Sequence, residues 1–195
     1  SLNCEAILQA WYPGQAGGQA VAEVLFGDYN PAGKLPLTFY RNLAQIPDFE
    51  DYNMTGRTYR YMKETPLFPF GHGLSYTTFK YGKLKMNDDK IAAGQNLNLV
   101  IPVTNTGSRD GDEVVQVYLK KMDDTEGPVK TLRAFKRVRI PAGKTVEVKF
   151  SLDDTQLEWW DEQSNTMRVC PGNYTVMIGG TSCEKSLLSR AFTIR

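Results

Sequence analysis

Histidine and cysteine are scarce in this 195-residue sequence, and their scarcity excludes several kinds of site. A single histidine, His72, gives a histidine-rich metal site or a Ser-His-Asp triad little to draw on. The three cysteines, Cys4, Cys170 and Cys183, show no metal-ligand spacing and are odd in number. Cys170 and Cys183 are expected at opposite ends of one strand, too far apart to be bridged. We therefore expect three free thiols, no metal and no cofactor.

Long apolar runs and an excess of charge of one sign are also absent. No apolar run approaches the roughly 20 residues that a membrane-spanning helix needs. The formal net charge is only +1, and the basic residues between 130 and 149 alternate with apolar ones, as on the solvated face of a strand. Binding to a nucleic acid normally needs a larger positive excess. We therefore expect neither a nucleic acid nor a membrane as a partner.

Residues 1–40 have the pattern of an incomplete α/β unit. The apolar run 6–11 predicts a strand buried on both faces, and 34–39 predicts a second short strand. Between them a helix is predicted from Gly18 or Gln19, with Gly27 just after its end. Its apolar face would carry Ala20, Val21, Val24 and Leu25. A unit of this size buries too little surface to be stable alone, so it must dock on a larger sheet elsewhere.

Residues 41–82 are predicted to form an ordered connector because they are rich in aromatic residues and proline. Flexible linkers are rich in Gly and Ser and poor in aromatics, whereas aromatic side chains bury large areas. The segment should therefore lie in a groove between two bodies. Its aromatic residues, counted from the preceding Tyr40, are Tyr40, Phe49, Tyr52, Tyr59, Tyr61, Phe68, Phe70, Tyr76, Phe79 and Tyr81.

Residues 83–195 alternate between apolar and polar residues with a period of two. About seven short strands in this range predict an antiparallel β-sandwich of the immunoglobulin or fibronectin-type-III kind, which makes the chain mostly β. Tyr174 opens a late strand and is a candidate tyrosine corner. The apolar positions of these strands are Leu97, Leu99, Ile101, Val103, Val115, Val117, Leu119, Val146, Val148, Phe150, Leu152, Tyr174, Val176 and Ile178.

The chemically suggestive motifs have simpler interpretations. The Gly-rich turn 13–18 resembles a phosphate loop but lacks its spacing. A steric need for small residues where the backbone turns tightly explains the glycines better. The acidic run 110–113 lacks the ligand ladder of a calcium loop. Trp159 and Trp160 are adjacent on a predicted strand, so one should face the core and the other solvent. From the residues alone we find no self-sufficient active site.

Several stretches together resemble the C-terminal end of family-3 glycoside hydrolases, which include many β-glucosidases and β-xylosidases. They are AWYPGQAGG at 10–18, VLFGDYNPAGKLP at 24–36, the segment 56–79, VTNTG at 103–107 and GDEVVQVY at 111–118. The resemblance extends through PVK at 128–130 and PGNY at 171–174, so it covers almost the whole chain.

The resemblance implies a catalytic barrel, then an α/β sandwich domain, then a fibronectin-type-III-like domain. This chain would contribute the end of the second domain at 1–40, the connector at 41–82 and the third domain at 83–195. Members of the family are retaining enzymes, with an aspartate nucleophile on the barrel and an acid/base carboxyl upstream of the Trp-Tyr-Pro-Gly motif. Neither motif is in this sequence, so no residue here inherits a catalytic role, and scaffolding is the function implied.

Trp11 and Gln15 are the candidate substrate-binding residues. They follow the end of a predicted strand, where α/β folds tend to place ligand sites. The implied partners are the upstream domains of the same protein and the oligosaccharide substrate of the parent enzyme, whose implied location, not readable from this chain, is secreted or periplasmic. The alternative is a stand-alone carbohydrate-binding or cell-surface module, for which the solvent-facing member of the Trp159 and Trp160 pair is the one hint.

Overall fold

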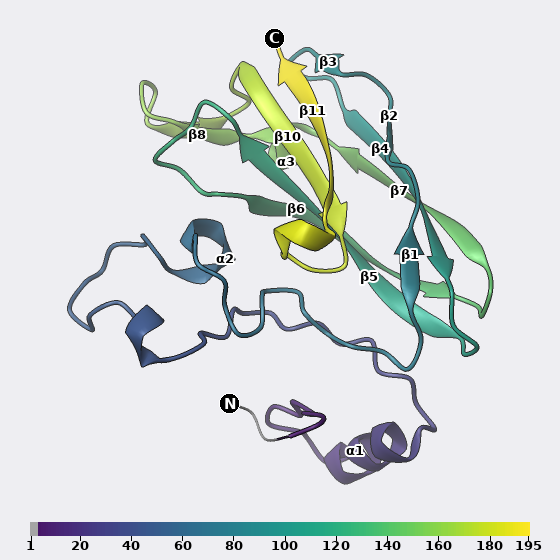
Figure 1. Ribbon diagram of the computed structural model, residues 1–195. Coiled ribbons are helices and arrows are strands. Elements are labelled where there is room, and N and C mark those ends of the chain that lie inside the picture. The colour runs from purple at the N-terminus through teal and green to yellow at the C-terminus, as the bar shows by residue number, and fades with distance from the viewer. Residues whose placement is uncertain (1–3) are drawn as a thin grey trace.

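The computed structural model describes residues 4–195 as a β-sandwich with an extended N-terminal part lying along one side of it (Figure 1). The N-terminal part holds the helix α1 (Gly17–Phe26), the 3-10 turn η1 (Leu43–Gln45) and the single-turn helix α2 (Thr58–Tyr61). No helix among the described residues is long and apolar enough to cross a membrane.

Two sheets form the sandwich. In the first, β4 (Leu97–Asn105) pairs with β1 (Phe79–Tyr81), β2 (Lys85–Met86) and β7 (Thr145–Leu152). The second has the order β3 (Lys90–Ile91), β11 (Leu188–Ile194), β10 (Gly172–Gly179), β5 (Gly111–Lys121) and β6 (Thr131–Ile140). All pairs are antiparallel except β3 with β11. The hairpin of β8 (Trp159–Asp161) and β9 (Thr166–Arg168), the helix α3 (Asp154–Leu157) and the turn η2 (Glu184–Ser186) complete the chain.

The core lies between the two sheets, where the period-two pattern predicts it. The apolar positions of β4, β5, β7 and β10 face inward and are buried, with Val146 partly so. Because successive side chains of a strand point to opposite faces, this alternation leaves Asn98 and Thr104 of β4 and the polar residues of β7 on the outer face, whereas Asn105 at the end of β4 is buried. The expected mostly β sandwich is therefore confirmed.

Tyr174 forms the predicted tyrosine corner. Its ring is buried and its hydroxyl donates a 2.8 Å hydrogen bond to the backbone carbonyl of Cys170. Tyr174→Phe is expected to lower the free energy of unfolding by about 1 to 2 kcal/mol, because the buried Cys170 carbonyl loses its partner. Denaturant titration measures this, with Tyr52→Phe as a control since Tyr52 is 89% exposed. Equal stabilities of Tyr174→Phe and the wild type would contradict the prediction.

The adjacent tryptophans divide as predicted. Trp159 is 4% exposed and faces the core, whereas Trp160 is 51% exposed. The Trp159 indole N–H donates to Asp124, and the guanidinium of Arg133 lies 5.2 Å above its ring. All three cysteines are free, and β10 separates Cys170 from Cys183 as expected.

Residues 4–40 differ in part from the predicted strand, helix and strand. The helix is confirmed as α1, which ends before Gly27 in the left-handed conformation at φ 82°. The strand predicted at 6–11 is wrong: this segment is exposed and pairs with no strand of the described chain. A parallel strand needs hydrogen-bonding neighbours, and none is available here. The apolar face of α1 is only partly covered, since Val21 and Val24 are half-buried but Leu25 is 66% exposed.

The second predicted strand, 34–39, is also wrong as a sheet strand. It is extended, but only Phe39 forms a bridge, and its partner Phe68 belongs to the connector. The backbone groups at the two ends of this run are hydrogen-bonded to residues of the connector and not to strands of a sheet.

The connector packs on the outer face of β5. Tyr118 points away from the sandwich core but is fully buried, because Tyr59 lies edge-on to it with ring centroids 5.8 Å apart. Tyr59 also stacks on Phe70 at 4.4 Å, and its hydroxyl accepts a hydrogen bond from the Leu132 N–H. The connector is therefore ordered, as its aromatic content predicts. The strand β1 lies at its end, within the predicted range 41–82.

Candidate functional site

The candidate site is the junction where residues 27–39, the connector and the sandwich meet. The segment 34–39 runs antiparallel to 67–72, with backbone hydrogen bonds at both ends. Leu35 donates to the His72 carbonyl and Gly71 donates to the Leu35 carbonyl, each at 2.8 Å. At the other end Phe39 and the 67–68 segment bond in the same way. The two segments therefore form one unit that rests on the sandwich.

Two glycines around His72 allow this close approach. Gly71 has φ 78°, and a Cβ atom there would lie 2.2 Å from the side-chain oxygen of Gln116. A Cβ atom at Gly73 would lie 2.1 Å from the backbone oxygen of Gly33. The Gly-His-Gly motif is therefore explained by chain contact, since only glycine fits at both positions.

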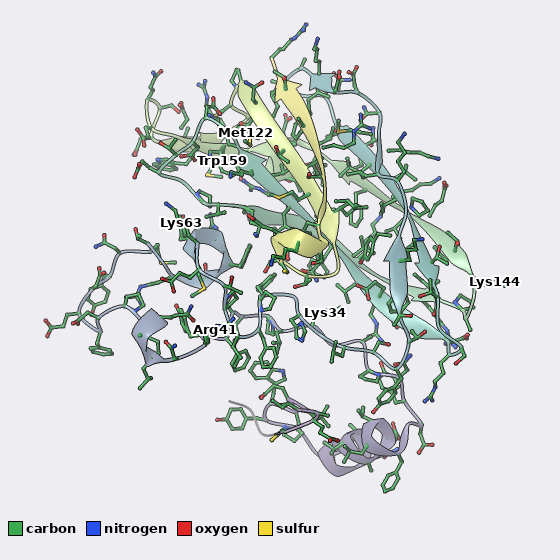
Figure 2. The ribbon with its side chains drawn as sticks, in the orientation of Figure 1. Lys34, Arg41, Lys63, Met122, Lys144 and Trp159 are labelled. Carbon is green, nitrogen blue, oxygen red and sulfur yellow. The ribbon has the colours of Figure 1, made fainter. Side chains whose placement is uncertain are left out.

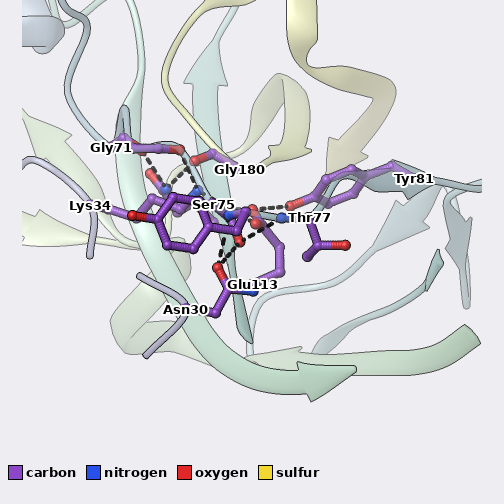
Figure 3. A network of polar contacts seen from close by, with 11 residues as sticks. Asn30, Lys34, Gly71, Ser75, Thr77, Tyr81, Glu113 and Gly180 are labelled. Atoms are coloured by element: carbon purple, nitrogen blue, oxygen red, sulfur yellow. Dashed lines mark hydrogen bonds and ion pairs between the residues drawn. The ribbon is translucent and has the colours of Figure 1, made fainter. Parts of the chain in front are cut away.

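A buried ion pair crosses the junction (Figure 3). The Lys34 ammonium lies 3.4 Å from the Glu113 carboxylate, and only 16% and 6% of these side chains are exposed. Lys34 also donates to the Gly73 carbonyl at 3.2 Å, and the Tyr81 hydroxyl donates to Glu113 at 3.0 Å. Figure 2 places Lys34 between the N-terminal segments and the sandwich. One pair thus ties together residues from all three parts of the chain.

Burial raises the pKa of the Glu113 carboxyl above its ordinary value, although Lys34 and the Tyr81 hydroxyl act in the opposite direction. The folded state therefore holds this proton more tightly than the unfolded state does. The stability that Glu113 contributes is fully present below its ordinary pKa and is lost as the pH rises through the raised one.

This pKa shift predicts a pH-dependent effect of Glu113→Gln. The variant removes the titration, so its free energy of unfolding should improve relative to the wild type as the pH rises from about 4 to 7. Thermal or denaturant unfolding at several pH values measures the difference. A difference that stays constant across this range would contradict the assigned direction.

Two asparagines fix the same junction from either side. The side-chain oxygen of Asn30 accepts from the Ser75 hydroxyl and the Tyr76 N–H, both at 2.8 Å, and its amide donates to the Asp110 carbonyl. Asn105 is fully buried and accepts from the Thr77 hydroxyl. Because each bond joins segments distant in the sequence, the junction is held in one arrangement.

His72 belongs to this junction as a packed side chain. Its ring stacks on Phe68 with centroids 5.2 Å apart. Burial and then the nearby Lys34 lower the pKa of His72, so the imidazole is neutral at neutral pH. The structural interpretation of the motif explains these contacts without a general base.

The predicted substrate-binding residues lie outside the junction. Trp11 and Gln15 are both exposed on the loop before α1, and Trp11 is 49% exposed with a positive φ of 55°. The structure brings neither into contact with the buried pair. Their role in lining a substrate pocket stays a prediction.

The carboxylates of the acidic run 110–113 point to different partners. Asp110 pairs with Arg139 at 3.3 Å, Asp112 pairs with Arg137 at 2.7 Å, and Glu113 faces Lys34. This divergence explains the run by ion pairs across neighbouring strands and favours no calcium site. Sequence reasoning missed Lys34, Glu113 and Tyr81, because nothing in their separate motifs marks them as neighbours.

Residues 4–76 carry an unusual amount of exposed apolar surface. Among the described residues, fifteen of the twenty exposed large hydrophobic side chains lie at or before Tyr76. Several are almost fully exposed. They include Tyr12, Phe26, Leu43, Phe49, Tyr52 and Leu74. Exposed apolar surface of this extent marks an interface.

Comparisons with known proteins also divide the chain into an N-terminal and a C-terminal region. A sequence profile described as the glycosyl hydrolase family 3 C-terminal domain matches residues 1–76, and one described as a fibronectin type III-like domain matches residues 113–182. The chain belongs to glycosyl hydrolase family 3, in its C-terminal region. The first profile covers the N-terminal part and most of the connector, and the fibronectin type III-like profile falls on strands of the sandwich.

Relatives with related sequences cover nearly the whole chain. A xylan 1,4-β-xylosidase of Xylanibacter ruminicola is 52% identical over 98% of this chain, which spans 22% of that protein. A periplasmic β-glucosidase of Salmonella typhimurium is 39% identical over 93% of the chain, which spans 25% of it. The crystal structure of a family-3 β-glucosidase from Bifidobacterium adolescentis aligns with a TM-score of 0.82 and 30% identity, over 95% of this chain and 29% of that one. The chain therefore corresponds to the C-terminal quarter of larger family-3 enzymes.

Proposed function

We propose that this chain is the non-catalytic C-terminal part of a retaining, exo-acting β-glycosidase that releases β-linked xylose or glucose. The observation that carries the proposal is the exposed apolar surface of residues 4–76 away from the sandwich edge, such as Tyr12, Phe26 and Phe49, next to a sandwich whose own core is complete. A surface of this kind fits the upstream α/β and barrel domains of the same protein as its partner. The chain would then hold the sandwich against those domains.

A scaffold role also agrees with the carboxylates of the chain. Retaining hydrolysis needs two carboxyl groups on either side of the glycosidic bond, one as nucleophile and one as acid/base. Glu113 is the one buried carboxylate among the described residues, and its oxygens are taken by Lys34 and Tyr81 inside the junction. We infer that the reacting carboxyls and the double displacement through a glycosyl-enzyme intermediate belong to the upstream domains.

Hydrolysis of aryl β-xyloside and aryl β-glucoside tests the proposal. The 195-residue chain is expected to be inactive, whereas the longer protein with its upstream domains is expected to hydrolyse at least one substrate. The preferred aryl glycoside would identify the sugar. Turnover by the 195 residues alone would overturn the scaffold role and assign catalysis to a carboxylate of this chain.

Trp11 and Gln15 remain our candidates for lining the approach to the substrate. The positive φ of Trp11 supports this, because such a backbone conformation is strained for a large side chain and is often kept for function. Trp11→Ala in the longer protein is expected to weaken substrate affinity, with Tyr12→Ala as the neighbouring control. Unchanged turnover and affinity together with lowered stability would make Trp11 purely structural.

The second candidate function is a carbohydrate-binding module, and it rests on the exposed Trp160. An indole face in solvent suits stacking on a sugar ring. The incomplete α/β segment speaks against a free-standing module, since such a module has no use for uncovered apolar surface. Titration of the chain with xylan or β-glucan, repeated with Trp160→Ala, separates the two functions.

A further inference from the structure

A polar groove of about 560 Å³ lies between the end of α1 and the edge of the sandwich. This volume is within the range of about 300 to 1,000 Å³ that is typical of small-molecule sites. One wall comes from the turn after α1, and the other from the start of β5 and the end of β6. The lining residues are Asp28, Tyr29, Asn30, Arg109, Asp110, Gly111, Asp112, Arg137 and Arg139.

The charge of the groove favours a neutral ligand. Three arginines and three aspartates line it, so the formal charges cancel. Arg137 pairs with Asp112, and Arg139 pairs with Asp110. A phosphate or a metal ion would meet compensated charges, whereas a ligand rich in hydroxyl groups can use donors and acceptors together.

Arg137, Tyr29 and Arg109 are held in place before any ligand binds, whereas Arg139 and Asp110 are 72% and 49% exposed. Arg137 donates to Asp112 at 2.7 Å and to the Tyr29 hydroxyl at 2.8 Å, which fixes the tyrosine ring. Arg109 donates to the Gly27 carbonyl and lies 5.7 Å above the ring of Tyr76. Fixed side chains lose little entropy on binding, which favours affinity.

Hydrogen-bonding capacity remains available toward solvent. A guanidinium has five N–H donors, and the bonds seen in the described chain use two of Arg137 and one of Arg139. The Ala142 N–H and then Arg139 hold the pKa of the Asp110 carboxyl below its ordinary value, so this acceptor is ionised at neutral pH. The Tyr29 side chain is 44% exposed and offers an apolar ring face.

We propose that this groove binds a neutral carbohydrate chain, with Arg139 and Asp110 bonding to adjacent hydroxyl groups and Tyr29 stacking on a sugar ring. The inference rests on the proposed function only for the choice of xylan and β-glucan as probes. It differs from the Trp160 candidate because Arg137 and Arg139 of the groove lie near the end of β6, whereas Arg133 near its start contacts Trp159 and Glu158 beside the hairpin.

Affinity electrophoresis of the longer protein in gels with soluble xylan or β-glucan tests the inference. The wild type is expected to be retarded by one of the polysaccharides. Arg139→Ala should raise its Kd by about tenfold, as expected for loss of one charge-assisted hydrogen bond. Tyr29→Ala should weaken binding similarly, and Tyr29→Phe less, because the phenylalanine keeps the ring.

Arg168→Ala is the matched control. Arg168 is an exposed arginine paired with Asp161 at 3.4 Å, much as Arg139 is paired with Asp110, but it lies on the β8–β9 hairpin. Its removal should leave Kd unchanged. An equal loss of affinity in Arg168→Ala and Arg139→Ala would overturn the proposed carbohydrate site. So would a wild type that neither polysaccharide retards.

Aryl glycoside hydrolysis by the same wild-type sample separates this inference from the proposed function. Hydrolysis without retardation overturns the groove alone. Retardation that depends on Arg139, without hydrolysis of any aryl glycoside, supports the groove and overturns the proposed enzyme.

Discussion

Lys34→Met is expected to lower the free energy of unfolding by about 3 to 5 kcal/mol at pH 7, because it leaves the buried Glu113 without its cation. The side chain of Glu113 is only 6% exposed, so water replaces little of the lost interaction. Methionine retains most of the aliphatic volume of the lysine, so the loss is one of charge and not of packing. Denaturant titration at pH 7 measures the effect.

The same variant should be less damaging in acid. A carboxyl that has lost its partner takes up a proton more readily, and the neutral form tolerates burial. The loss of stability should therefore shrink between pH 7 and pH 4. Lys85→Met is the control, because Lys85 and its partner Glu147 are 67% and 53% exposed and such pairs contribute about 1 kcal/mol or less. A Lys34→Met variant no less stable than Lys85→Met at pH 7 would show that the pair does not hold the junction.

Gly73→Ala is expected to lower the free energy of unfolding by about 1 to 3 kcal/mol and to loosen the connector from residues 33–35. The new Cβ atom would lie 2.1 Å from the Gly33 carbonyl oxygen, and a backbone atom cannot rotate away. The clash should push apart segments 33–35 and 71–73, which the hydrogen bond from Leu35 to His72 joins. Unfolding experiments measure the stability, and limited proteolysis near the connector measures the loosening.

Gly33→Ala is a matched control for this substitution. Gly33 is the residue that Gly73 touches, but its own Cβ position has no atom within 4 Å. Its replacement should change stability by about 0.5 kcal/mol or less. If Gly73→Ala were as stable and as protease-resistant as Gly33→Ala, close chain passage would not explain the second glycine of the motif.

The sandwich could be predicted because its evidence is local. Each strand of the core carries apolar residues at every second position, and turns such as 141–143 separate the strands. The same local reasoning located Tyr174 and divided Trp159 from Trp160 correctly. Such patterns need no knowledge of distant residues, since side chains on one strand alternate by geometry alone.

The strands at 6–11 and 34–39 could not be judged in this way. An apolar run becomes a sheet strand only if neighbours satisfy its backbone groups, and the described chain offers the first run no neighbour. The second run finds the connector at Phe68 instead of a sheet. Pattern alone therefore predicted extended chain but not its partner.

The sequence by itself determined the sandwich, the helix α1, an ordered connector and the resemblance to family 3, because each depends on spacing or on motifs within a short segment. Only the tertiary structure decided that Tyr59 covers Tyr118, that Gly73 touches Gly33 and that Lys34 meets Glu113. Lys34 and Glu113 are 79 residues apart, and their contact depends on how three segments pack together. No local pattern carries that information. Lys34 and Glu113 are each an ordinary charged residue within their own segments, and they become a buried ion pair only when those segments pack together.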